Sequence, residues 1–260
     1  MTPSLQLRAV TLRVPELAPS VDFYSRQLGF AVSARTTDTA ELSVSEGQPP
    51  ILTLVADPGA PPAPANAAGL FHVALVLPSR AALAGWLRHA AATGVKFDGF
   101  SDHGVSEAIY LTDPHGNGLE FYADRPRSAW PMKQGELAMF TLPLDLQGLL
   151  ALPPTAANSL LAGAHWGHLH LRVTNLERSE AFYLPALGLT VTQGSFPGAR
   201  FLAADGYHHH LGINTWGSPR LAQPPNALGL AEATFAYRGS SSEKTVRDPD
   251  GIAIRVQPLA

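Results

Sequence analysis

The chain has 260 residues, of which 45% are apolar and 15% charged, with 23 Gly, 23 Pro, 10 His and no Cys. The length predicts two domains, or two halves of one, each large enough to bury a core. The absence of cysteine excludes a disulfide scaffold, a thiolate-bound metal site and a cysteine nucleophile, so metal chemistry must use histidines, carboxylates or a bound cofactor.

The charge balance argues against polyanionic partners. Eighteen Lys and Arg residues against 21 Asp and Glu residues give a net charge of −3, without basic runs. This pattern disfavours nucleic acid as a partner. The first residues lack a charged region followed by an apolar one, and no stretch reaches about 18 consecutive apolar residues. We therefore expect a soluble, cytoplasmic protein with no membrane partner.

An internal repeat organises the sequence. Residues 12–29 match residues 171–188 at an offset of 159, with Leu-Arg-Val, Phe-Tyr and Leu-Gly at equivalent places. Residues 66–70 match residues 226–230 at an offset of 160. Each longer copy is typical of a strand, then an amphipathic helix whose start is marked by a serine, then a glycine at the helix end.

Each half divides once more. Residues 9–15 match residues 72–78, and a helix is predicted over 79–93. Two strands follow at 107–112 and 119–122, separated by the turn Asp-Pro-His-Gly-Asn-Gly. The unit is therefore a strand, a helix and three further strands, and it occurs four times.

The fourth repeat is truncated. Asp248 follows Leu230 by 25 residues fewer than Asp113 follows Leu70, so its helix is expected to be missing or vestigial. The repeats predict an α+β fold of two modules made of four βαβββ repeats. The expected boundaries are 1–124 for the first module, 125–164 for an apolar connector packed on the modules, and 165–260 for the second module.

Metal-ligating residue types gather in repeats two and three. The start of the first strand carries Ala9, His72, His168 and Glu232 in the four repeats. Glu120 lies between two apolar residues on the last strand of repeat two, so strand alternation turns it to the opposite face from them. Its counterpart in repeat four is an arginine, at position 255.

Two imidazoles and one carboxylate form the ligand set of mononuclear non-haem Fe(II) oxygenases, which keep coordination positions open. His72, His168 and Glu120 are therefore candidate ligands, joined by one or more histidines of the run 208–210, which lies in a predicted strand over 207–214. Alternation sends the first and third of these histidines to one face and the middle one to the other. The alternative is that each histidine is a buried, hydrogen-bonded core residue.

These features together resemble the vicinal oxygen chelate superfamily, which includes glyoxalase I, extradiol ring-cleavage dioxygenases and bleomycin resistance proteins. The carriers are the four repeats, the first-strand His and the Glu in Asp-Pro-x-Gly-x-x-x-Glu. Within the superfamily, the chain is similar to the bacillary catechol-2,3-dioxygenase type. The similar segments are 69–72, 102–111, 113–120, 123–127, 167–170 and 206–210.

The resemblance implies cup-shaped mixed sheets and an Fe(II) site, Mn(II) being an alternative, held by His72, His168 and Glu120. In familiar two-module extradiol enzymes all ligands come from the second module, whereas here they come from repeats two and three. A single site is possible only if those two repeats share one cup-shaped sheet. Repeats one and four would then form a second cup without metal.

By position, the resemblance also implies that His210 is the acid/base near the metal and that Tyr110 and His103 contact the substrate. The expected function is an extradiol dioxygenase that cleaves catechol-type aromatic diols with O2, in aromatic compound catabolism. One alternative is a glyoxalase-type isomerase or lyase using Ni(II) or Zn(II), which His210 disfavours because it stands where a second carboxylate is usual. Another is a bleomycin-resistance-like binding protein without metal.

The truncated fourth repeat raises the question of assembly. Loss of its helix could leave an open strand edge, which a partner chain would then cover. A homo-oligomer is therefore a further alternative to a monomer.

Overall fold

The computed structural model describes residues 4–153, 159–218 and 221–259. Its first half contains β1 (Leu5–Val14), α1 (Leu17–Asp22), the π-helical turn η1 (Phe23–Gln27), β2 (Ala31–Arg35), β3 (Thr39–Ser43), β4 (Leu52–Ala56), β5 (Gly69–Leu77), α2 (Arg80–Ala92), β6 (Phe97–Asp102), β7 (Ser106–Thr112) and β8 (Gly118–Asp124). The middle contains a 3-10 turn η2 (Arg127–Ala129), β9 (Met132–Lys133), β10 (Glu136–Leu137), β11 (Leu142–Pro143) and α3 (Leu146–Leu150). The remainder contains β12 (His165–Arg172), α4 (Leu176–Leu187), β13 (Thr190–Gln193), β14 (Ala199–Ala203), β15 (Leu211–Asn214), β16 (Gly229–Tyr237), β17 (Lys244–Arg247) and β18 (Ala253–Pro258).

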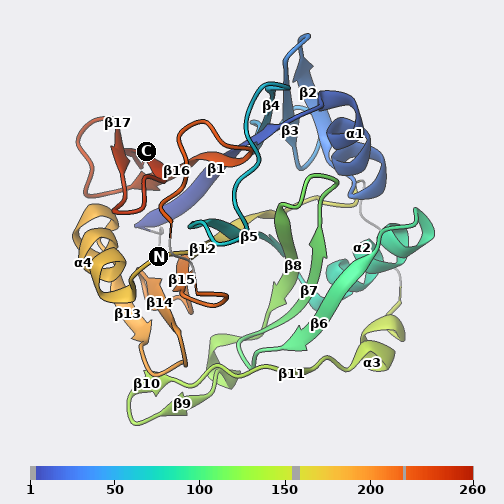
Figure 1. The fold of residues 1–260 in the computed structure, drawn as a ribbon. Helices are drawn as coiled ribbons and strands as arrows, with labels where there is room; N and C mark the ends of the chain where they lie inside the picture. Colours follow the sequence, from blue (N-terminus) through green and yellow to red (C-terminus); the bar gives the residue numbers. More distant parts are fainter. Residues whose placement is uncertain (1–3, 154–158, 219–220, 260) are drawn as a thin grey trace.

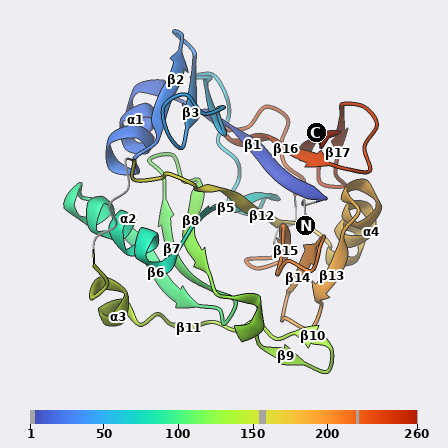
Figure 2. The same ribbon diagram turned by 180° about the vertical axis from the view of Figure 1, so that it is seen from behind.

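Two large mixed sheets organise the described residues (Figures 1 and 2). A nine-stranded sheet has the order β11-β6-β7-β8-β5-β12-β15-β14-β13, and a seven-stranded sheet has the order β17-β18-β16-β1-β4-β3-β2. Repeats two and three therefore share one sheet, and repeats one and four share the other. This is the pairing that a single site requires, and the α+β class is confirmed.

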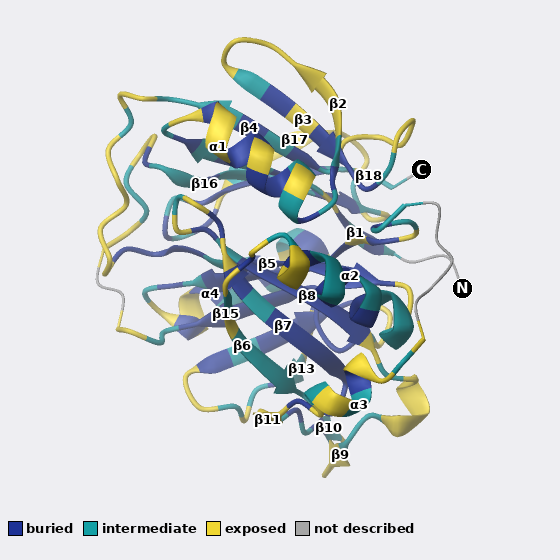
Figure 3. Ribbon diagram, turned by 90° about the vertical axis from the view of Figure 1, so that its right-hand side faces the viewer, coloured by how far each residue is buried: buried dark blue, intermediate teal, exposed yellow. Residues whose placement is uncertain are grey.

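The core lies between the sheets and beneath the helices. Strand β5 is buried along nearly its whole length, as expected for a central strand with covered faces. Trp86 of α2 stacks on Phe121 of β8, with ring centroids 3.7 Å apart, on the outer side of the nine-stranded sheet. Trp166 of β12 donates a hydrogen bond to the Ile51 carbonyl, which ties the two sheets together. Figure 3 shows the buried strands in the middle of the molecule and exposed residues on β2 and the outer side of α1.

The helix starts differ from the sequence-based expectation. Helix α4 is capped by Asn175, whose side chain accepts from the Arg178 N–H, while Ser179 lies inside the helix. Likewise Ser20 lies within α1, where its hydroxyl donates to the Glu16 carbonyl one turn earlier. Ser20 thus bonds to the preceding turn, whereas the buried Ser179 hydroxyl has no hydrogen-bond partner among the described residues, and neither serine marks the first helical residue.

The internal repeat places the same tyrosine–aspartate hydrogen bond at two equivalent positions. The Tyr24 hydroxyl of η1 donates to Asp113 at 3.1 Å, and the Tyr183 hydroxyl of α4 donates to Asp248 at 2.9 Å. In each case the helical segment of one repeat binds the Asp-Pro-x-Gly turn of the next. The Phe-Tyr pairs thus contribute a buried hydrogen bond besides packing.

The fourth repeat has lost its helix, as expected. Residues 238–243 connect β16 to β17 through turns and bends. Residues 125–153 run along the nine-stranded sheet, where β11 pairs with β6. The module boundaries at 124 and 164 stay a prediction. Within the part of the chain that the structure describes, no helix is long and apolar enough to cross a membrane.

Candidate metal centre

Three neighbouring strands carry the three candidate ligands. His72 lies on β5, Glu120 on the parallel strand β8 and His168 on the antiparallel strand β12. Ala74 of β5 is the strand-pairing partner of Glu120 on one side and of His168 on the other. His72 lies on β5 two positions before Ala74. Residues two apart or directly paired share one face of a sheet, so the three side chains converge on the concave side.

The three side chains meet closely. Glu120 Oε2 lies 3.0 Å from His72 Nε2 and 3.1 Å from His168 Nε2, and the two Nε2 atoms are 3.4 Å apart. Each side chain is at most 7% exposed. Among the described residues, this is the group of three His, Asp or Glu side chains whose ligand atoms converge tightly enough to hold an ion.

The donor set fits a divalent transition metal. Ligands at right angles around an ion with bonds of about 2.1 Å stand about 3 Å apart, close to the separations of these three atoms. No Lys or Arg among the described residues forms an ion pair with Glu120, whose close partners are the imidazoles of His72 and His168. A carboxylate buried in this way needs a cation nearby, and a metal ion would supply it.

The protonation states also suit metal binding. Burial lowers the pKa of His168 to about 4, so its imidazole is neutral at pH 7. Burial acts to raise the pKa of the Glu120 carboxyl, but His168 and His72 outweigh it and bring that pKa well below its usual range. Metal ligands must be deprotonated, and both groups are so at neutral pH. His168 Nδ1 is buried without a partner, so the rings of Tyr122 and His209, 5.1 and 4.0 Å away between centroids, hold its orientation.

A cavity of about 390 Å³ opens over the three ligands. Tyr110 and His103 form a polar wall of this cavity. Tyr110 of β7 is the cross-strand partner of Glu120 on β8, and His103 lies in the β6–β7 turn. His103 Nδ1 lies 2.7 Å from the Phe140 carbonyl, and its Nε2 lies 2.7 Å from the Tyr110 hydroxyl. Burial and the nearby Glu120 raise the pKa of Tyr110 well above its usual value, so the phenol keeps its proton.

The rest of the cavity is largely aromatic. Several of its walls come from segments that the sequence did not single out, namely the connector and repeat three. These residues are Met139 and Phe140 of the connector and Phe196, Phe201 and Trp216 of repeat three, and they join Phe71 of β5. The apolar content of the connector was the one signal that pointed to packing on the modules. Such a lining suits a flat apolar ligand with a few polar atoms.

His210 does not line this cavity, contrary to the expectation from sequence. It lines a second cavity, of about 830 Å³, where its Nδ1 accepts from the Ala204 N–H. His209 lines the metal cavity instead, against His168. Of these two histidines, His209 is therefore the one that lies beside the candidate ligands.

The segment that carries the three histidines is not the regular strand expected from the sequence. The predicted strand over 207–214 begins only at Leu211, because Asp205 and Gly206 both have positive φ, 56° and 63°, and turn the chain. The three histidines lie in the irregular segment that follows, yet they still alternate: His209 lines the metal cavity, whereas His210 lines the second cavity and His208 binds Asp124, which lines it too. The dipeptide Asp-Gly is a common turn signal, so the sequence did hold a clue to the later strand start.

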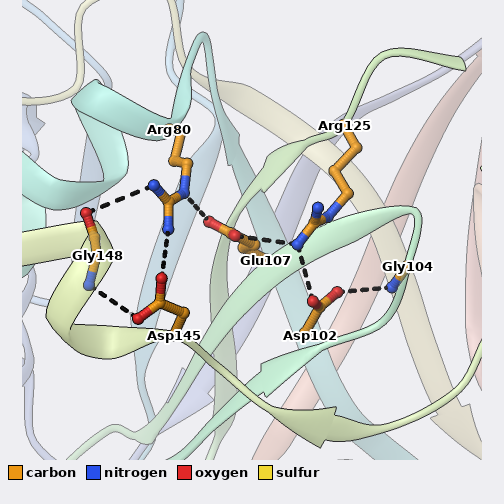
Figure 4. Close-up of polar contacts among 7 residues, drawn as sticks. All are labelled: Arg80, Asp102, Gly104, Glu107, Arg125, Asp145 and Gly148. Carbon is orange, nitrogen blue, oxygen red and sulfur yellow. Dashed lines mark hydrogen bonds and ion pairs between the residues drawn. The ribbon is translucent and has the colours of Figure 1, made fainter. Parts of the chain in front are cut away.

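An ion-pair network fixes the turn that presents His103 (Figure 4). The buried Glu107 carboxylate binds Arg80 of α2 at 2.5 Å and Arg125 at 3.1 Å, and Arg125 also binds Asp102 at 2.8 Å. Asp102 in turn accepts from the Gly104 N–H at 2.8 Å. The network joins the start of α2, the β6–β7 turn and the end of β8, so the turn that carries His103 is held from both sides.

The equivalent face of the seven-stranded sheet has different chemistry. There the counterpart of His72 is Glu232, which binds Arg255 at 2.7 Å, and Arg255 also binds Glu243 at 2.8 Å. The Arg255 guanidinium thus supplies the positive charge beside these carboxylates. Among the described residues, the second cup therefore holds an ion pair in place of a ligand cluster.

Three βαβββ units and a shortened fourth, paired into two curved sheets with a cluster of two histidines and a glutamate in one of them, define a protein of the vicinal oxygen chelate class. Residues 6–121 match the family model described as "Glyoxalase/Bleomycin resistance protein/Dioxygenase superfamily". A protein of Bacillus subtilis (strain 168) named catechol-2,3-dioxygenase is 40% identical over 229 residues, covering 84% of this chain and 78% of the relative. The chain belongs to the glyoxalase/bleomycin resistance/dioxygenase superfamily.

Solved structures support the same fold. A candidate dioxygenase of Bacillus subtilis covers 99% of this chain and 86% of its own, with a TM-score of 0.67 and 13% identity. Glyoxalase I from Zea mays covers 98% of this chain and 92% of its own, with a TM-score of 0.57 and 15% identity. At such low identities the similarity extends to the fold alone.

Proposed function

We propose that this chain is an Fe(II)-dependent extradiol dioxygenase that cleaves catechol-type aromatic diols with O2. The observation that carries the proposal is the convergence of His72, Glu120 and His168 beneath an aromatic-lined cavity that also presents His209 and Tyr110. The 40% identity to a protein named catechol-2,3-dioxygenase supports the same activity. Mn(II) is the alternative metal, and a cytoplasmic location stays a prediction from composition.

The two histidines and the glutamate would hold the metal. When bound, such an ion supplies adjacent open positions for the diol and for O2. The set carries a single negative charge, so a catecholate can approach it without excessive repulsion. The aromatic walls at Phe71, Phe201 and Trp216 exclude water and hold the ring flat against the site.

The remaining polar residues handle protons. His209, whose pKa burial lowers well below its usual value, is a neutral base at the cavity wall and takes a proton from a catechol hydroxyl. Tyr110 keeps its proton and hydrogen-bonds to an oxygen of the substrate, with His103 behind it at 2.7 Å. Tyr110 and His103 keep the substrate-contacting roles expected from the sequence, and His209 takes the role expected of His210.

The test is direct ring cleavage. Protein loaded anaerobically with Fe(II), then given catechol and air, should yield a yellow ring-fission product. No colour from a panel of substituted catechols, with stoichiometric metal present, would overturn the proposal.

The alternatives have distinct outcomes. Glyoxalase-type isomerisation would use a second carboxylate at the metal, but the other carboxylate lining the cavity, Asp98, is exposed and accepts from Thr112 at 2.6 Å. Turnover of a glutathione hemithioacetal by the metal-loaded protein would reverse the ranking. Binding of an aromatic ligand by purified protein without transition metal would instead favour a sequestering role.

A further inference from the structure

A chain of hydrogen bonds connects His209 Nδ1, through His208, to Asp124. His209 Nδ1 lies 2.7 Å from His208 Nδ1, and His208 Nε2 lies 2.9 Å from Asp124 Oδ1. The His208 side chain is fully buried, whereas that of Asp124 is 31% exposed. Asp124 lines the second cavity, so the chain runs from the metal cavity on one side to the 830 Å³ cavity on the other. The proposed chemistry assigns no task to Asp124 or His208.

The chemistry of the partners fixes the direction of each bond. A carboxylate only accepts, so His208 Nε2 carries the hydrogen that reaches Asp124. A neutral imidazole has one N–H, and His208 Nδ1 is therefore an acceptor. Its close neighbour His209 Nδ1 must then be the donor. The other oxygen of Asp124 accepts from the Tyr207 hydroxyl at 2.9 Å, so the carboxylate is held in place.

The buried His208 ring has mainly aromatic neighbours. The rings of Tyr122, Trp130 and Tyr207 pack around it, with centroids 6.0, 5.3 and 4.0 Å away. The His168 ring lies 6.1 Å away between centroids. One N–H directed at Asp124 meets the need of the buried ring.

The other ring nitrogen of His209, Nε2, is then the one without a hydrogen. Since its Nδ1 carries the hydrogen, a neutral His209 has its lone pair on Nε2. This atom forms no hydrogen bond with any described residue, and the ring lines the metal cavity. The lone pair is therefore available to a ligand in that cavity.

We propose that Asp124 and His208 are positioning residues that hold His209 in the tautomer with its basic Nε2 toward the substrate. The inference rests on the proposed function. In the proton step the O–H bond of the diol breaks, its proton forms a bond to His209 Nε2, and the electron pair stays on the diol oxygen. His208 accepts from the Nδ1–H throughout and Asp124 fixes His208, in the manner of a base oriented by a third group.

The tautomer can be observed without turnover. Full-length protein labelled with 15N-histidine and loaded with Zn(II), a diamagnetic metal, gives separate NMR signals for protonated and unprotonated ring nitrogens. The His209 signals are assigned by their absence from the His209→Asn protein. We expect a protonated Nδ1 and an unprotonated Nε2. A proton on Nε2 in the wild-type protein would overturn the inference whether or not the protein cleaves catechols.

Two variants link the tautomer to rate. His208→Phe keeps the ring among its aromatic neighbours but removes the acceptor, and Asp124→Ala removes the carboxylate. Both should shift His209 toward the Nε2–H tautomer and lower kcat roughly 10- to 100-fold, with KM and metal content nearly unchanged. His165→Gln is the matched control, because this exposed histidine also lines the second cavity but lies outside the chain of bonds. If both variants kept the wild-type tautomer and kcat, the positioning role would be wrong.

Discussion

The ring of His209 lies 4.0 Å, centroid to centroid, from the ring of His168, a candidate metal ligand. This contact distinguishes His209 from the next residue, His210, which lines the second cavity. Two adjacent residues of the same type are thus assigned to different environments, and their variants form a matched pair.

Replacement of these two histidines should give opposite results. His209→Asn removes the proposed base, so we expect kcat for catechol cleavage to fall roughly 100- to 10,000-fold. His210→Asn keeps an acceptor for the Ala204 N–H and should change kcat less than about threefold, since this side chain lies outside the metal cavity. Steady-state ring cleavage by both Fe(II)-loaded proteins tests this. The reverse order of effects would restore His210 as the base.

Metal should stabilise the protein through Glu120. We expect one transition metal ion per chain and, with metal at about 100 times its dissociation constant, a gain of about 2.7 kcal/mol in the free energy of unfolding. Glu120→Gln removes the one carboxylate of the cluster and the buried charge with it. Its Tm should then respond little to added metal or chelator. Metal analysis and thermal unfolding check both points, and an unchanged metal content in the variant would contradict the ligand assignment.

Stability of the metal-free protein should fall in mild acid. Burial lowers the pKa of His168 and of His210 to about 4, against a usual value of 6.5. Between these values the unfolded chain binds protons that the folded chain does not, so the free energy of unfolding decreases as the pH falls from about 6.5 to about 4. It is flat with respect to these groups above 6.5.

Each of these two histidines should lower the free energy of unfolding by about 2 kcal/mol at pH 5 relative to pH 7.5. Urea unfolding at several pH values measures the loss. His210→Asn should remove the contribution of His210 to this pH dependence and leave the lining of the metal cavity unchanged. If the variant showed the same slope as the wild-type protein, His210 would not be held neutral by burial.

The network around Glu107 should matter for both stability and binding. Glu107→Gln leaves Arg80 and Arg125 without their shared buried partner, and because both guanidiniums are more than a third exposed, water offsets part of the loss. We expect a loss of about 1–3 kcal/mol in urea unfolding and a higher KM, because the turn carrying His103 loosens. Asp145→Asn is the control: its side chain is 70% exposed and 3.9 Å from Arg80, so it should cost less than about 0.5 kcal/mol.

The two repeat-related tyrosines should behave alike. Tyr24→Phe and Tyr183→Phe each remove a hydroxyl that binds a buried turn aspartate. Each should cost about 1–2 kcal/mol in unfolding, with costs that add in the double variant because the two sites are independent. Ring-cleavage activity should persist in all three proteins. A large cost at one site alone would contradict the structural equivalence of the two pairs.

Much of this protein follows from its sequence because the repeats make it comparable with itself. The alignment identified the four βαβββ units, the lost fourth helix and the equivalence of His72 with His168, and the Asp-Pro-x-Gly turn located Glu120. These features depend on local pattern and period, which a linear chain displays directly.

Tertiary structure decided where those patterns meet. Strand order brings β8, β5 and β12 side by side, and pairing through Ala74 sets the ligand distances, neither of which periodicity contains. The turn at Asp205 and Gly206 delays the start of β15, and the folded segment directs His209 to the metal cavity and His210 to the second cavity. The aromatic walls contributed by the connector depend on long-range packing. Which side chains converge is set by the register and folding of distant segments, and only the folded chain fixes that register.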